Sequence, residues 1–103
     1  MNNYQNVDVD KLANIYFEGK VVSHIVKFSD GTIKTLGVML PGEYEFSTQK
    51  KEQMEISRGE LDVLLPGQSN WMRIEEGETF DVPAGSTFKM KIHQITDYCC
   101  SYE

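Results

Sequence analysis

A short stretch near the middle of the chain gathers three kinds of side chain that can do chemistry. Ser47 and Thr48 supply two hydroxyls and two backbone N–H groups, which together can hold an anion. Glu43 supplies a carboxylate that can accept hydrogen bonds from two adjacent hydroxyls or stabilise a developing cation. Tyr44 and Phe46 are two residues apart, so on a strand they share one face, where aromatic rings can stack on a flat ligand. The plainer interpretation of this stretch is a strand end with solvated polar groups and two core aromatics.

The residues that most often bind metals or form disulfides are few. The two histidines, His24 and His93, lie in separate segments without a matched third ligand, which is typical of surface or hydrogen-bonded side chains. Cys99 and Cys100 are neighbours, and adjacent strand residues point to opposite faces, so a disulfide between them would be strained. We therefore expect two reduced thiols and no metal site built from these four residues.

Length and charge limit the class of protein. The 103 residues allow one domain, and their 40% of apolar residues can fill a single core without metal or disulfide support. The formal net charge is −6, and the basic groups at Lys50-Lys51 and Lys89–Lys91 are too short to form the stripe that binds phosphate backbones. No apolar run approaches the ~18 residues of a membrane span, and the first twenty residues lack a signal-peptide pattern. We expect a cytoplasmic protein that binds neither nucleic acid nor membranes.

Apolar and polar residues alternate with the period of two that is typical of β-strands. Alternating runs cover residues 21–28, 61–65 and 87–92, and Gly-containing turns separate the runs at short intervals. Many short strands joined by tight turns favour an all-β sandwich or barrel. The exception is the stretch Gln5–Tyr16, where an aspartate can cap a short helix.

The same alternation predicts two hairpins and a core. Asp30-Gly31 lies between two alternating runs and can take the positive φ values that a hairpin turn requires. Arg58-Gly59-Glu60 predicts a second hairpin, between residues 54–57 and 61–65. The residues expected in the core are Leu61, Val63, Leu65, Phe80, Val82, Met90 and Ile92.

The most specific pattern is Gly77-Glu-Thr-Phe-Asp-Val-Pro83-Ala-Gly85, which predicts a strand between a Gly turn and a Pro-x-Gly turn. A second pattern is Glu52 followed, after six residues, by Gly59. Together they resemble the two sequence motifs of the cupin family, which are small jelly-roll barrels. The resemblance implies an all-β, single-domain cupin jelly-roll barrel of two antiparallel sheets.

Metal-binding cupins carry histidines in both motifs, and this sequence has other residues at those positions. The positions are held by Glu45 and Ser47, or by Phe46 and Thr48, before the motif glutamate, and by Phe88 after the Pro-x-Gly turn. The resemblance is therefore to cupins that work without a metal.

A larger set of segments is similar to the small single-domain family of pyrimidine/purine nucleoside phosphorylases. The similarity runs from Asn14 to Tyr102, and Gly-Glu-Tyr-x-Phe-Ser-Thr, Val-Leu-Leu-Pro and Phe-x-Val-Pro are specific in combination. Further matching segments are Asn14-Ile-Tyr-Phe-Glu-Gly-Lys20, Ser86-x-Phe88 and Thr96-Asp-Tyr98-x-Cys100-Ser-Tyr102. The resemblance implies a cupin domain over residues 14–103. Residues 1–13 are expected to form an N-terminal extension with the flexibility that is common at chain ends.

This second resemblance implies phosphorolysis of nucleosides. Inorganic phosphate displaces a purine or pyrimidine base from C1 of the ribose, giving the free base and ribose 1-phosphate, with no cofactor and no metal. Positive charge is expected to develop on the sugar, as in other glycosyl transfers, so Glu43 is the catalytic candidate. The substrate-binding candidates are Tyr44, Phe46 and Phe88 for the base, with Phe88 facing the other two across the barrel, and Ser47 and Thr48 for phosphate. The cations available to phosphate are Lys50, Lys51, Arg58 and Arg73, and the resemblance points to none of them.

Other functions remain open at this level. A small cupin can bind a sugar or nucleotide without catalysis, because fold alone does not determine function. A metal-free isomerase acting on a nucleotide sugar would need a histidine base beside an acidic partner, and His93 has no evident partner in the sequence. Trp71 and Tyr98 are interpreted as framework or interface residues, and open sheet edges favour a homodimer.

Overall fold

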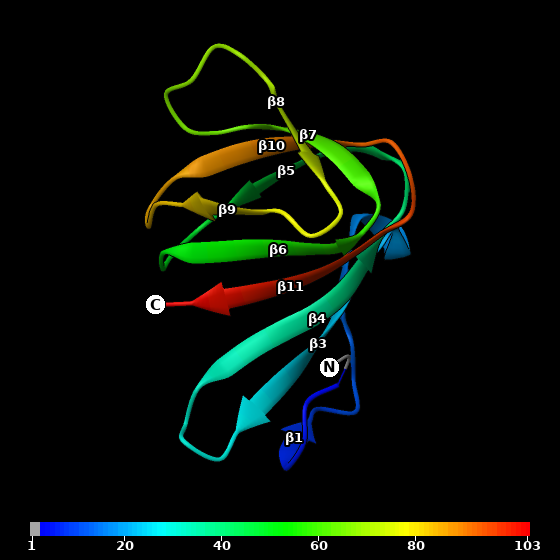
Figure 1. Cartoon of the computed structure of the whole chain (residues 1–103), viewed down its shortest axis with the longest axis vertical. Helices are drawn as coiled ribbons and strands as arrows, with labels where there is room; N and C mark the ends of the chain where they lie inside the picture. Colours follow the sequence, from blue (N-terminus) through cyan, green and yellow to red (C-terminus); the bar gives the residue numbers. More distant parts are fainter. Residues whose placement is uncertain (1–2) are drawn as a thin grey trace.

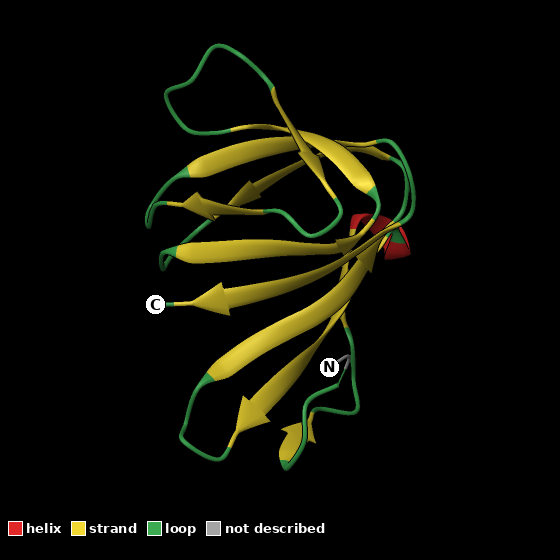
Figure 2. Ribbon diagram, viewed as in Figure 1, coloured by secondary structure: helices red, strands yellow, loops and turns green. Residues whose placement is uncertain are grey.

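The computed structural model describes residues 3–103, which form two antiparallel β-sheets packed face to face (Figure 1, Figure 2). The large sheet has the order β1-β3-β4-β11-β6-β9, and β2 also pairs with β3. Its strands are β1 (Val7–Val9), β2 (Asn14–Tyr16), β3 (Val21–Phe28), β4 (Ile33–Met39), β6 (Glu52–Arg58), β9 (Thr79–Val82) and β11 (Thr96–Tyr102). The small sheet has the order β5-β10-β7-β8, with β5 (Gly42–Ser47), β7 (Glu60–Leu64), β8 (Met72–Glu75) and β10 (Thr87–Ile92). The predicted all-β fold of two antiparallel sheets is confirmed.

The core lies between the inner faces of the two sheets. Successive side chains of a strand point to opposite faces, so each strand buries every second residue. Along β10, Phe88 and Met90 are buried, whereas Thr87 and Lys89 are exposed. Of the predicted core, Leu61, Val63, Phe80, Val82, Met90 and Ile92 are buried and Leu65 packs partly buried against them.

The N-terminal part differs from the prediction, because Gln5–Tyr16 contains no helix. It contains β1 and β2 instead, which pair in succession with the same edge of β3. Strand pairing satisfies backbone N–H and C=O groups of β3 that a helix would leave without partners. Residues 1 and 2 of the predicted N-terminal extension lie outside the described residues. The helical segment found in residues 3–103 is the short 3-10 turn η1 (Phe17–Gly19), and no helix there has the length and apolar character needed to cross a membrane.

The two predicted turns have different outcomes. Asp30-Gly31 joins β3 to β4 in a hairpin, with Gly31 at φ 91° and the Thr32 N–H donating to Asp30 Oδ1 at 2.9 Å. Gly59 does not form the predicted hairpin, because β6 belongs to the large sheet and β7 to the small one. Gly59, at φ 109°, turns the chain from one sheet into the other, and a Cβ atom there would collide with Thr96. The alternation shows where strands lie, but it does not show which strands share a sheet.

Candidate active site

A cavity of about 150 Å³ lies between the two sheets. Residues of β5 and β10 line it from the small sheet, and residues of β3, β4, β6 and β11 line it from the large sheet. The small-sheet wall is mostly apolar, with Phe46, Phe88 and Met90, and has Ser47 at its edge. The large-sheet wall has two apolar residues, Met39 and Met54, and is otherwise polar, with Ser23, Thr35, Glu52, Tyr98, Cys100 and Tyr102. A cavity of about 150 Å³ is large enough for benzene, so this one encloses about one ring of a ligand. A ligand with two or more rings would extend through the opening.

The apolar wall is built by a cross-strand aromatic pair. Phe46 and Phe88 are opposite each other in the register of β5 and β10, with ring centroids 6.1 Å apart and an interplanar angle of 27°. The expectation that Phe88 faces Phe46 across the barrel is therefore wrong, because the two residues are neighbours in one sheet. Phe88 is only 3% exposed, whereas Tyr16, whose ring centroid lies 5.7 Å from that of Phe46, is 44% exposed. Tyr16 therefore marks the open side of the cavity and Phe88 its deep side.

The polar wall is built mainly by β11 and β6. Tyr98, Cys100 and Tyr102 are spaced by two along β11, so all three side chains point inward. The Cys100 thiol donates to Glu52 Oε1 at 3.5 Å, and the Tyr102 and Thr35 hydroxyls share a hydrogen bond of 3.1 Å. These contacts fix the wall while leaving most of the acceptor capacity of Glu52 for a ligand.

Burial controls the protonation of this wall. It raises the pKa of Cys100 and the pKa of Tyr98 to about 12 each, and it also raises the pKa of Tyr102, so all three groups are neutral donors at pH 7. Burial likewise raises the pKa of Glu52, against the opposing effect of the Cys100 hydrogen bond. Among the described residues that line the cavity, none is Lys or Arg and Glu52 is the one carboxylate. The site therefore favours positive charge over negative charge.

Three of the predicted site residues, Glu43, Tyr44 and Thr48, do not line this cavity. Glu43 is exposed on the outer face of β5, opposite Lys91 in the register with β10. Tyr44 points inward like Phe46, but its phenol donates to the Leu40 carbonyl at 2.7 Å. Tyr44 therefore contributes to the core at the end of the barrel, and Glu43 faces solvent.

The predicted anion cradle is also divided. Ser47 is exposed at the rim of the cavity, with its hydroxyl 3.3 Å from that of Thr87. Thr48 is buried, and its hydroxyl donates to the Pro83 carbonyl at 2.7 Å. The Thr48 N–H donates to the Ser86 carbonyl at 2.8 Å, so both donors of Thr48 are used within the chain.

The motif positions converge in the cavity. In one of the two possible alignments with the first cupin motif, Phe46 lies at a histidine position, and Phe88 lies at the histidine position of the second motif. Both line the same space as the motif glutamate, Glu52. In residues 3–103, no group of three His, Cys, Asp or Glu side chains is arranged to hold a metal ion. Sequence reasoning gave no site role to Glu52 or to Tyr98 and Cys100, although the motif and the spacing of two along β11 were available signals.

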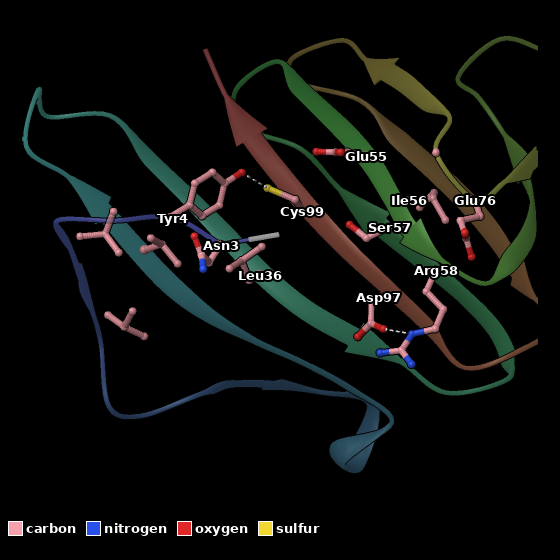
Figure 3. Close-up of a pocket in the computed structure, with 14 residues that line it drawn as sticks. Asn3, Tyr4, Leu36, Glu55, Ile56, Ser57, Arg58, Glu76, Asp97 and Cys99 are labelled. Atoms are coloured by element: carbon pink, nitrogen blue, oxygen red, sulfur yellow. Dashed lines mark hydrogen bonds and ion pairs between the residues drawn. The ribbon is translucent and has the colours of Figure 1, made fainter. Parts of the chain in front are cut away.

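Two charged clusters lie away from the cavity. A larger groove of about 1010 Å³ runs over the outer face of the large sheet, where Arg58 donates a hydrogen bond to Asp97 (Figure 3).

On the small sheet, His93 Nε2 lies 3.0 Å from Asp62 Oδ2, so the expectation that His93 has no acidic partner is wrong. Hydrogen bonds from Arg73 and His93 hold the pKa of Asp62 below its usual range. The His93–Asp62 pair does not line the cavity.

Comparison with known proteins identifies the family. A sequence model of the pyrimidine/purine nucleoside phosphorylase family matches residues 11–102. The chain belongs to this family. Relatives named pyrimidine/purine nucleoside phosphorylase, from Sulfurovum sp. (strain NBC37-1) and Geobacter sulfurreducens, are each 56% identical over 102 residues. These alignments cover 99% of this chain and 99% and 98% of the two relatives. The predicted resemblance is confirmed.

Solved structures support the fold. A protein of unknown function from Acinetobacter sp. ADP1 superposes with a TM-score of 0.96 at 40% identity, covering 98% of both chains. An RmlC-like cupin from Shewanella frigidimarina superposes with a TM-score of 0.70 at 12% identity, covering 95% of this chain and 84% of that one. The second match shows the cupin fold alone.

Proposed function

We propose that the protein catalyses the phosphorolysis of purine and pyrimidine nucleosides in the cavity between its two sheets. The observation that carries this proposal is the contrast between the two walls, one aromatic and one bearing hydroxyls and a carboxylate. A nucleoside has matching parts, a flat base and a ribose with hydroxyls. The names of the relatives from Sulfurovum sp. and Geobacter sulfurreducens support the same activity.

The size of the cavity suggests an orientation for the nucleoside. Because the cavity encloses about one ring, the ribose lies inside against the polar wall and the base lies at the opening. There the base stacks on Phe46 and on Tyr16, whose ring is 44% exposed. Stacking accepts any base, because every base has a π face, and it therefore supports a broad range of purines and pyrimidines.

We place the phosphate at the rim of the cavity. Ser47 is exposed there, and the connection to β6 that follows it carries Lys50 and Lys51. The Lys51 ammonium lies 3.7 Å from the Glu103 carboxylate, an exposed pair that a phosphate can replace at small cost. Arg58 and Arg73 are engaged on the outer faces of the two sheets.

The site roles of Glu43, Tyr44 and Thr48 stay predictions. Glu43→Gln, Tyr44→Phe and Thr48→Val test them in the assay below, together with the melting temperature of each variant. A loss of turnover in Glu43→Gln at an unchanged melting temperature would support a substrate site on the outer face of the small sheet.

The activity is tested by incubating the purified protein with uridine, inosine and guanosine, with and without phosphate and with a chelator. We expect base release that requires phosphate and persists in the chelator, since the mechanism proposed here uses no metal. The alternative is a cupin that binds a nucleoside or sugar without catalysis, which the lack of Lys and Arg among the described lining residues favours. Binding of the nucleosides without release of any base would support that alternative.

We also propose a cytoplasmic homodimer. Cys99 and Cys100 are both unpaired thiols, which suits a reducing compartment. Leu36 and Val9 leave apolar surface exposed at the groove on the outer face of the large sheet, which a second copy can cover. Gel filtration should give a mass near twice 11.8 kDa, and a mass near 11.8 kDa would contradict the dimer.

A further inference from the structure

We infer that Glu52 is a catalytic residue whose carboxylate stabilises the positively charged ribosyl group as the bond to the base breaks. The inference rests on the proposed function, because it names the group that acts on the sugar in that reaction. It places this role inside the cavity, whereas Glu43 lies on the outer face of the same barrel.

The position of Glu52 supports the role. Glu52 begins β6, and it is paired with Tyr102 of β11 and with Val82 of β9, so its place on the cavity wall is fixed from both sides. Its side chain is partly buried and lines the same space as Phe46 and Phe88. A sugar held between the aromatic wall and the polar wall therefore contacts this carboxylate.

The charge of the cavity supports the role as well. Glu52 is the one carboxylate among the described lining residues, and no Lys or Arg among them neutralises it. Its protein partner is the Cys100 thiol, which is neutral at pH 7 and a weak donor. A carboxylate without a strong partner in a site of low dielectric attracts a cation more strongly than it would in water.

Glu52 neither gives nor takes a proton in the proposed reaction. The bond between C1 of the ribose and the base nitrogen breaks, and its electron pair goes to the base. An oxygen of hydrogen phosphate forms the new bond to C1, and the proton of hydrogen phosphate ends on the base. Glu52 stays ionised throughout, lowers the energy of the cationic sugar between these two events, and accepts hydrogen bonds from ribose hydroxyls.

The test compares Glu52→Gln with the matched control Glu55→Gln. Glu55 lies three positions further along β6, and its side chain is exposed and lines the groove on the outer face. Uridine and inosine are assayed beside p-nitrophenyl riboside, whose leaving group departs without a proton. We expect Glu52→Gln to lower kcat on all three substrates by about a hundredfold or more with little change in KM. Glu55→Gln should stay close to the wild-type rate, and Glu52→Asp, which keeps the charge, should recover part of the loss.

The outcomes separate the inference from the function on which it rests. An active wild-type protein with an equally active Glu52→Gln would overturn the inference alone. A loss on uridine and inosine but not on p-nitrophenyl riboside would also overturn it, because Glu52 would then be a proton donor to the base. A wild-type protein without phosphate-dependent base release would overturn the proposed function itself. Circular dichroism of Glu52→Gln and calorimetric binding of inosine without phosphate show whether the variant is folded and still binds.

Discussion

Partial burial of the Glu52 carboxylate makes the stability of the fold depend on pH. Burial raises the pKa of Glu52, so the fold favours the protonated form. Protonated Glu52 therefore adds to the free energy of unfolding. This contribution is fully present below the pKa that Glu52 has in the unfolded chain, and it is lost as the pH rises through the pKa of Glu52 in the folded state. Above the pKa of the folded state the wild-type protein lacks this contribution, and a neutral residue at position 52 would keep it.

We therefore expect Glu52→Gln to melt at a higher temperature than the wild-type protein at pH 7. The difference should shrink as the pH falls toward 4, because Glu52 then becomes protonated. Thermal unfolding of both proteins at several pH values measures this difference. A variant that melts lower than the wild type at pH 7 would show that the carboxylate is stabilising.

Phe88 combines a place in the core with a place on the cavity wall. It is 3% exposed and packs against Phe46 and Phe80. Phe88→Ala should therefore cost ~3–5 kcal/mol in the free energy of unfolding, measured by urea denaturation. A cost below about 1 kcal/mol would mean that neighbouring side chains move into the space left by the Phe88 ring.

Residue types alone indicated useful chemistry but not where each side chain points. Ser47 and Thr48 look equivalent in the sequence, yet one is exposed and the other is buried with its donors engaged. The alternation of a strand predicts that neighbours diverge, and it also places Glu43 and Phe46 on opposite faces. It could not show which face borders a cavity, because that depends on how the second sheet packs.

At the scale of elements, Gly59 determines how β6 leads into β7. Its φ of 109° and the close approach of Thr96 both require glycine. Gly77 has a similar φ of 88°, but nothing lies near the position of a Cβ atom there, which makes it a matched control.

Gly77→Ala should lower the free energy of unfolding by about 1–2 kcal/mol from backbone strain alone. Gly59→Ala should lower it by about 1–3 kcal/mol more, because the methyl group also displaces Thr96. Denaturation curves of the two variants measure the difference. Equal losses would show that the corner between the sheets tolerates a side chain.

The elements themselves were largely predictable. Alternation located β3, β4, β7 and β10 closely, because half-buried strands repeat with a period of two, and the turn residues of the Gly77–Gly85 pattern located β9. Prediction from alternation failed where pairing with a strand distant in the sequence determines the local structure. The stretch Gln5–Tyr16 is extended because β3 offers it an open edge. Gly59 is a corner rather than a hairpin because the partners of β6 are β9 and β11.

At the scale of the whole molecule, residues 1–13 are predicted to be an extension of an independent cupin domain. Val9 pairs with Val26, and Tyr4 packs edge-on against Phe28. Removal of residues 1–13 should leave the domain folded and active but lower its melting temperature, because Val26 becomes exposed. Circular dichroism and the phosphorolysis assay check this, and an unfolded or inactive product would contradict the predicted domain boundary.

The two sheets enclose the site in which we propose that the nucleoside binds. A crystal structure of the protein with inosine, grown without phosphate so that no turnover occurs, tests it most directly. We predict the ribose inside the cavity against Glu52 and the base at the opening on Phe46. Inosine bound on the outer face of the small sheet beside Glu43, with the cavity empty, would contradict the account.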